Sequence, residues 1–180
     1  MLLFLRNARF GIVYAAMGVA FIALSGSAEG LMSPRIIIGF AGLITGFVQS
    51  LIGVIALLGA IFFRNITFKT AHVFTMIGFL LLLIAILTGI RIDDQRIEQS
   101  KQIGDAIFEK VNAYVESNER CPLSLNEIES FKDAIPKPTI RFSEYRYRQT
   151  EDGGCYLEFA APMFLSCTRR NDEAEWRCND

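Results

Sequence analysis

Three long runs of apolar residues occupy the first half of the chain, at residues 10–28, 36–63 and 71–90. An α-helix needs about 20 mostly apolar residues to cross the roughly 30 Å hydrocarbon core of a bilayer. The first and third runs have this length, and the second is long enough to cross at a tilt. We therefore expect a membrane α-helical bundle of three spans within a transmembrane domain of residues 1–91.

The second run leaves one alternative open, because Gln49 and Ser50 interrupt its apolar character. A re-entrant hairpin broken at that point would not cross the bilayer. No proline or charged residue accompanies these two polar residues, so one continuous span is the better interpretation.

Charge divides the chain into two parts, although the net charge is only −1. Residues 1–91 contain six basic side chains and one acidic side chain, a net charge of +5. Residues 92–180 contain twelve basic and eighteen acidic side chains, a net charge of −6. Such an asymmetry is typical of two physically different domains. The second domain, residues 92–180, is polar and mildly acidic, and without a basic face it is not expected to bind nucleic acid.

The short flanks of the apolar runs predict the orientation in the membrane. Arg6 and Arg9 precede the first run, Arg64 and Lys69 lie between the second and third, and only Arg35 lies between the first and second. The positive-inside rule then places the N-terminus and the connection after the second run in the cytoplasm. Three crossings leave the polar domain outside. We expect a multi-pass protein of the cell (bacterial inner) membrane with a periplasmic or extracellular C-terminal domain.

The first run also resembles a signal peptide, with basic residues before it and small residues near Ala28. An uncleaved anchor is the preferred interpretation because two more apolar runs follow. Cleavage would leave the polar domain on the same side of the membrane.

All four cysteines lie in the polar domain: Cys121, Cys155, Cys167 and Cys178. An even set confined to one domain is expected where disulfides persist, which agrees with a location outside the cytoplasm. No C-x-x-C pair is present, and the single histidine, His72, lies in the apolar half. Neither a zinc site nor thiol exchange is therefore expected, and no cofactor.

Four cysteines allow three pairings. Residues 164–178 have the pattern of a hairpin folded about residues 172 and 173, which sets Cys167 opposite Cys178. That leaves Cys121 to pair with Cys155. This connectivity is a hypothesis that peptide mapping under non-reducing conditions can test.

Small residues recur at helical spacing in the second apolar run: Gly39, Gly42, Gly46, Ser50 and Gly53. Such a stripe lets another helix approach closely. It predicts a helix–helix interface, either among the chain's own helices, which we favour, or with a protein partner or a second copy. No Asp, Glu, Lys or Arg lies in the middle of a run, so ion or solute transport is not expected.

Residues 94–118 repeat apolar side chains with a period of 3.6, as at Ile97, Ile107 and Val111. This period predicts a helix with one buried face. No proline separates it from the third apolar run. A single long helix therefore fits both segments, with Gly89 or Gly104 as possible bends.

The segment that follows predicts a corner and a short helix. Pro122 ends the long helix, because a residue before proline is pushed towards an extended conformation. Ser124 followed by Glu127 matches a capping box and predicts a helix over residues 125–134. Its inner face comprises Leu125, Ile128 and Phe131.

Alternating residues then predict an antiparallel sheet. Residues 140–149 form the first expected strand, with Tyr145 and Tyr147 alternating with charged side chains. Residues 155–164 form the second. One face of the second strand comprises Cys155, Leu157 and Phe159.

Residues 97–159 together resemble the globular region of type IV pilins and type II secretion pseudopilins. The resemblance rests on a long helix with a hydrophobic start, then "CPLSLNEI", "IPKP", "YRYR", a Gly-Gly turn and "CYLEF". It implies an α+β fold in which the helix packs on an antiparallel sheet. The family's leader and the glutamate near the start of its hydrophobic helix are missing from the third apolar run, so assembly into a fibre is not expected.

The residues favour no catalytic chemistry. The polar domain has no histidine and no nucleophile motif, and its adjacent acid pairs are typical of solvated or capping groups. We expect a non-enzymatic structural or interaction subunit of an envelope assembly. The alternative is a sensory or small-ligand-binding membrane protein, suggested by four aromatic residues of the polar domain: Tyr145, Tyr147, Tyr156 and Trp176.

Overall fold

The structure, a computed structural model, describes residues 2–27, 34–60, 66–132, 134–150, 153–162 and 165–179. The predicted ends of the first two spans, residues 28 and 61–63, lie outside this set. The chain forms two compact units, which we call the helical unit and the head. The helical unit comprises Met1–Ser25 and Met32–Arg91, and the head comprises Gly26–Leu31 and Ile92–Asp180.

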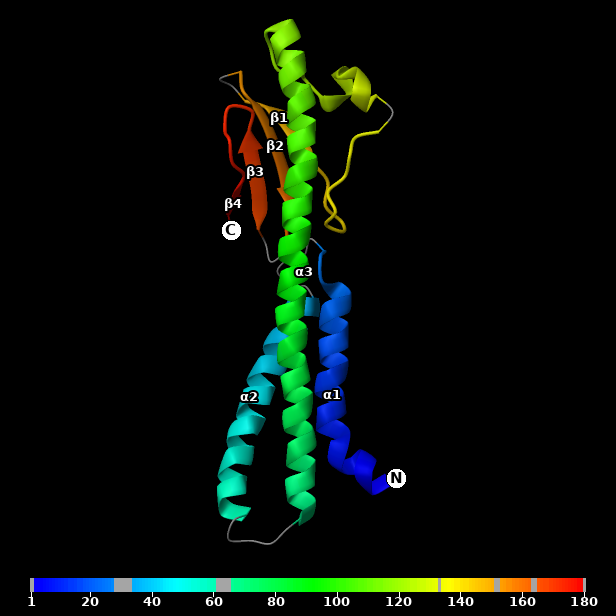
Figure 1. The fold of residues 1–180 in the computed structure, drawn as a ribbon, viewed down its shortest axis with the longest axis vertical. Helices are drawn as coiled ribbons and strands as arrows, with labels where there is room; N and C mark the ends of the chain where they lie inside the picture. The colour runs from blue at the N-terminus through cyan, green and yellow to red at the C-terminus, as the bar shows by residue number, and fades with distance from the viewer. Residues whose placement is uncertain are drawn as a thin grey trace. The chain divides into compact units, whose positions relative to one another are not determined.

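Within the described residues of the first two thirds of the chain, the structure has three helices: α1 (Leu2–Leu24), α2 (Pro34–Ala60) and α3 (Ile66–Asn118) (Figure 1). α2 runs without a break through Gln49 and Ser50, so the re-entrant alternative is wrong. α1 ends before residue 28 because the chain turns at Ser25 and Gly26, and Gly26 adopts a φ of 75°.

Two of the described helices, α2 and α3, are long and apolar enough to cross a membrane. Their qualifying segments are Pro34–Leu51 and Val73–Asn118. The apolar stretch of α1, Arg9–Leu24, is shorter than the length required. By length and composition the structure therefore supports two candidate spans where the sequence predicts three.

α3 is a single helix of 53 residues, as its periodicity predicts. Its first part belongs to the helical unit and its second part to the head. Gly89 and Gly104, the two possible bends, are points of close packing within their units. Phe21 and Ser25 lie over Gly89, and the ring of Trp176 lies over Gly104.

The head contains a four-stranded antiparallel sheet in the order β1-β2-β3-β4. The strands are β1 (Arg146–Gln149), β2 (Cys155–Ala160), β3 (Ser166–Arg170) and β4 (Arg177–Asn179). The predicted alternation in β2 is confirmed, since its inner side chains are fully buried: Cys155, Leu157 and Phe159. An α+β head with an antiparallel sheet is therefore present.

β1 starts six residues later than the sequence pattern predicts. Phe142 has a φ of 62°, and the N–H of Ser143 donates to the carbonyl of Ile140 at 3.3 Å. This turn takes residues 140–145 out of the sheet. Ile140 still enters the core, with 2% of its surface exposed.

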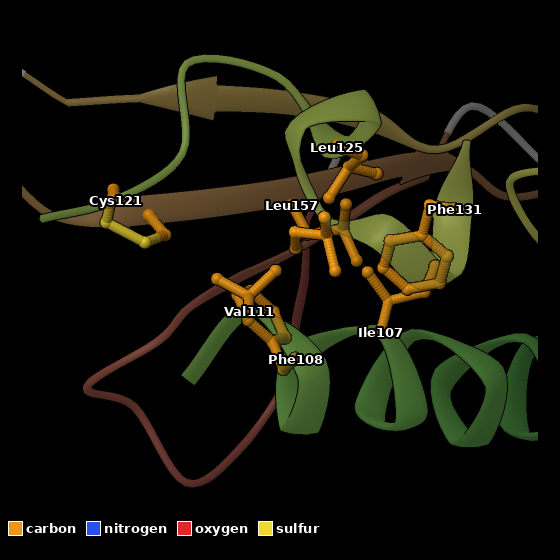
Figure 2. Packing of buried hydrophobic residues seen from close by; sticks show 9 residues of the cluster. Ile107, Phe108, Val111, Cys121, Leu125, Phe131 and Leu157 are labelled. Carbon is orange, nitrogen blue, oxygen red and sulfur yellow. A yellow bond between two sulfur atoms is a disulfide. The ribbon is translucent and has the colours of Figure 1, made fainter. Parts of the chain in front are cut away.

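The main core of the head joins α3, the segment of residues 121–131, which we call the corner segment, and β2 (Figure 2). Ile107, Phe108 and Val111 project from α3 towards Leu157 of β2, as the 3.6-residue period predicts. A second cluster continues this core: Ile97, Ile140, Phe159, Ala161 and Cys167.

The corner segment differs from the predicted short helix. It forms two 3₁₀ turns, η1 (Leu125–Glu127) and η2 (Glu129–Phe131), and the side chain of Ser124 makes no capping hydrogen bond. The predicted inner face is nevertheless buried: Leu125, Ile128 and Phe131.

Candidate functional site

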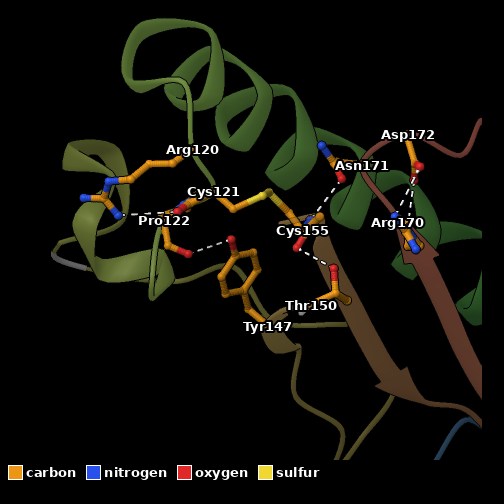
Figure 3. The surroundings of a disulfide bond; sticks show 10 residues. Arg120, Cys121, Pro122, Tyr147, Thr150, Cys155, Arg170, Asn171 and Asp172 are labelled. Carbon is orange, nitrogen blue, oxygen red and sulfur yellow. Dashed lines mark hydrogen bonds and ion pairs between the residues drawn. A yellow bond between two sulfur atoms is a disulfide. The ribbon is translucent and has the colours of Figure 1, made fainter. Parts of the chain in front are cut away.

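The Cys121 corner is tied to the sheet by a disulfide. Cys121 pairs with Cys155 of β2, with 5.7 Å between their Cα atoms (Figure 3). Cys167 pairs with Cys178 across β3 and β4, at 4.0 Å, and these two residues are also register partners. This is the connectivity that the sequence favours. Both bridges lie within the head.

Tyr147 provides a second contact, besides the disulfide, between the corner segment and the sheet. Its hydroxyl donates to the carbonyl of Pro122 at 2.8 Å (Figure 3). Burial, with the nearby Glu127 carboxylate, raises the pKa of Tyr147 to about 12. A tyrosine of the first strand thus holds the backbone of the corner through a polar contact.

Glu127 takes a different role from the capping box. Its carboxylate accepts from the hydroxyl of Tyr114 at 3.0 Å and from the N–H of Leu123 at 3.2 Å. Arg120 lies 3.6 Å away. The hydrogen bond to Glu127 raises the pKa of Tyr114. Held by Tyr114 and Arg120, this carboxylate accepts from the N–H of Leu123, and no capping box forms.

Trp176 lies against the second half of α3. Its indole Nε1 donates to Oδ1 of Asp105 at 2.6 Å, and Arg169 forms an ion pair with the same carboxylate. The ring centroids of Phe159 and Phe108 lie 5.3 and 6.2 Å from that of Trp176. Trp176 therefore serves the packing of the head.

Tyr145 is also tied into the fold. Its hydroxyl donates to the backbone carbonyl of Ser100, and its ring meets Phe159 edge-on at 5.6 Å. Burial, together with the Asp105 carboxylate, raises its pKa. Tyr156 is half-buried on β2. Of the four aromatic residues considered for ligand recognition, three are thus used in packing.

A shallow groove of about 360 Å³ opens between the corner turns and the start of the sheet. Its lining includes two exposed apolar residues, Ile135, which is 36% exposed, and Pro136. Lys132 and Lys137 line its rim. Glu144 is the acidic residue of the lining, and it pairs with Lys137 at 3.6 Å.

The small-residue stripe of α2 faces helices of the same chain. A side chain at Gly39 would meet Phe21, one at Gly42 would meet Leu82, and one at Gly46 would meet Phe79. Ser50 is half-buried, and the surroundings of Gly53 lie outside the described residues. The favoured intramolecular interpretation accounts for these contacts, and a contact with a second copy stays a prediction.

Among the described residues, no group of three or more His, Cys, Asp or Glu side chains is placed to hold a metal ion. Within the same ranges every cysteine is in a disulfide. In comparisons with known proteins, no family model, no curated protein and no solved structure matches the chain. The function is therefore inferred from the geometry of the head and of the helices.

Proposed function

We propose that this protein is a non-enzymatic, three-span membrane protein that presents a disulfide-stabilised head outside the cytoplasm as an interaction subunit of an envelope assembly. One observation carries the proposal. α3 is one helix whose first part is apolar and whose second part forms the core of the head. The proposed anchor and the head thus share one continuous helix, whose second part contributes Ile107, Phe108 and Val111 to the core of the head.

The surface of the helical unit supports the membrane part of the proposal. Large apolar side chains are exposed along all three helices, among them Val19, Phe40, Phe47, Ile55 and Leu87. Water-soluble proteins rarely leave such extended apolar surface uncovered. In the head, by contrast, the exposed large apolar side chains among the described residues are three: Leu123, Ile135 and Phe142.

Polar groups within the helices also fit a lipid environment, where each must find an internal partner. The hydroxyl of Tyr14 donates to the side-chain carbonyl of Gln49 at 3.0 Å. Thr45 and Thr88 donate to the carbonyls of Ala41 and Ile84, one turn earlier in their own helices. These contacts lower the cost of placing polar groups in hydrocarbon.

The head supports the interaction part of the proposal. A long helix packed on an antiparallel sheet is the arrangement that the resemblance to pilin heads implies, and two disulfides are expected where thiols oxidise. The groove beside Ile135 offers exposed apolar residues together with the lysines of its rim. It suits a protein segment that carries apolar and acidic side chains.

Photo-crosslinking in native membranes tests this proposal. A benzophenone side chain in place of Ile135 is expected to give one adduct of defined mass. Reversing the rim charges with Lys132→Glu and Lys137→Glu should remove the adduct, and Lys→Arg replacements at both positions should retain it. The proposal is wrong if irradiation yields no adduct and the protein purified in mild detergent is only a monomer without partners.

A second candidate, recognition of a small ligand, is favoured by the same groove. Its volume of about 360 Å³ falls in the range of small-molecule sites. Small carboxylic acids such as acetate and citrate would suit the lysine rim. If these acids raise the melting temperature of the full chain in detergent and the Lys132→Glu variant abolishes the shift, ligand recognition replaces the interaction role.

A further inference from the structure

Phe142 is the most exposed large apolar side chain in the head, with 92% of its surface open. It also has a φ of 62°, in the left-handed region that non-glycine residues rarely occupy. A protein keeps such a strained residue only when its surroundings hold it there. An aromatic ring held out in this way requires an explanation other than packing.

The loop around Phe142 is fixed on both sides. Ser143 donates its N–H to Ile140, which is buried beside Phe159. Arg141 donates its N–H to the carbonyl of Gly26 at 3.0 Å, and Ser27 and Arg141 form a parallel bridge. The exposure of Phe142 is therefore built into the fold of the head.

Chain continuity limits how far this loop can lie from the ends of the apolar segments. Gly26 follows the last residue of α1, Leu24, by two positions. Its N–H donates to Oδ1 of Asp93 at 2.7 Å, and Asp93 follows the third apolar run by three positions. Consecutive Cα atoms are about 3.8 Å apart, so Phe142 lies within roughly 10 Å of Gly26. Through Gly26 the loop is thus close to the end of α1, and through Asp93 it is close to the end of the third apolar run.

We propose that Arg141 and Phe142 form an interfacial anchor that inserts into the bilayer surrounding the chain's own helices. The ring of Phe142 enters the boundary between lipid headgroups and acyl chains, where aromatic side chains are favoured. The exposed guanidinium of Arg141 faces the phosphate groups. The proposed occupant is lipid because chain continuity keeps the loop near the ends of the apolar segments. This inference rests on the proposed membrane embedding of the helices.

A matched control lies at the other end of the head. Leu123 is 70% exposed and follows the end of α3. Asp93 and Asn118 are both in α3, and a rise of 1.5 Å per residue puts them roughly 38 Å apart. A probe at Leu123 should therefore remain in water while a probe at Phe142 meets lipid.

Tryptophan fluorescence of the full chain in vesicles tests the anchor. Phe142→Trp, Leu123→Trp and Phe47→Trp are each reconstituted in phosphatidylcholine–phosphatidylglycerol vesicles with and without brominated acyl chains. The emission of Trp176 in the unmodified chain is subtracted. The Phe142→Trp signal is expected to lose roughly half of its intensity to brominated lipid and to resist iodide. Leu123→Trp should show the opposite behaviour, and Phe47→Trp, on the exposed face of α2, should be quenched by lipid most strongly.

The three probes separate failure of the anchor from failure of the membrane proposal. If Phe47→Trp is quenched by lipid but Phe142→Trp is not, the anchor is wrong and the membrane proposal stands. If Phe142→Trp is shielded from iodide but not quenched by brominated lipid, something other than lipid covers this position, and the anchor is wrong. If neither probe is quenched by lipid, both proposals are wrong.

Discussion

Gly26 shows how much of the head's geometry a single residue can fix. Its N–H donates to buried Asp93, and its carbonyl accepts from Nη1 of Arg96 and from the N–H of Arg141, both at 3.0 Å. Its φ of 75° is accessible to glycine at little cost. The side chain of Arg96 fills the space where a Cβ would stand. Three segments far apart in the sequence meet at this residue.

A matched pair of glycine substitutions measures this role. Gly153 has a φ of 83°, and no atom lies within 4 Å of the place that an added methyl group would take, so Gly153→Ala adds only backbone strain. We expect it to lower the free energy of unfolding by about 1 kcal/mol. Gly26→Ala adds a clash with Arg96 and loosens buried hydrogen bonds, so a loss of about 3 kcal/mol is expected. Equal losses in urea unfolding of the full chain would contradict this account.

Tyr147 makes the stability of the head depend on pH. An unfolded tyrosine titrates near pH 10, whereas burial raises the pKa of Tyr147 in the head to about 12. Between these values the folded state keeps the proton that the unfolded state has lost. The stabilisation is therefore complete below pH 10 and is lost as the pH rises through 12.

Tyr147→Phe should flatten this dependence. The free energy of unfolding, followed by Trp176 fluorescence, should fall less between pH 9 and pH 11 than in the unmodified chain. At pH 8 the variant should be less stable by about 1 kcal/mol, because the carbonyl of Pro122 loses its donor. Tyr156→Phe is the control, since within the described residues its hydroxyl makes no hydrogen bond. A similar flattening in that variant would remove Tyr147 as the cause.

Among the elements, α3 was the most predictable and the corner segment the least. The 3.6-residue period and the lack of proline define α3, and alternation defines β2, because both patterns are local. The expected capping box of Ser124 and Glu127 does not form, because the Glu127 carboxylate contacts Tyr114 and Arg120 at the end of α3. A pattern of neighbouring residues cannot predict these contacts, because they form only in the folded head.

The edges of the elements depend on distant contacts in the same way. Residues 140–145 leave the predicted strand because Arg141 bonds to Gly26, 115 positions earlier. The groove beside Ile135 likewise arises from segments that meet only in the folded head. The disulfide pairing was accessible from sequence because the β3–β4 hairpin is local and only one pair then remains.

Helix packing in α2 gives a prediction at this scale. Gly46 faces the ring of Phe79, whereas Ala41 is on the exposed side of the same helix. Gly46→Leu should force α2 away from α3 and lower the melting temperature of the detergent-solubilised chain. Ala41→Leu, an enlargement of similar kind, should leave it unchanged. If Gly46→Leu instead alters only the mass of the particle in detergent, the stripe serves association between copies.

For the molecule as a whole, the two disulfides differ in the length of chain that they close. Cys121 and Cys155 are 34 positions apart, and Cys167 and Cys178 are 11 apart. The loop-entropy relation gives about 4 kcal/mol for the first bridge and about 3 kcal/mol for the second. Replacing Cys121 and Cys155 by alanine should therefore destabilise the head more than replacing the other pair. Chemical unfolding of the full chain decides this, and the reverse order would contradict it.

The proposed function requires the head to lie across the membrane from the connection between α2 and α3. Thiol labelling with a membrane-impermeant maleimide tests this requirement most directly, using Ser130→Cys in the head and Thr70→Cys near the start of α3. In intact spheroplasts Ser130→Cys should be labelled and Thr70→Cys should not, and everted membrane vesicles should reverse the pattern. Labelling of both positions on one side, or recovery of the chain in the soluble fraction, would contradict the account.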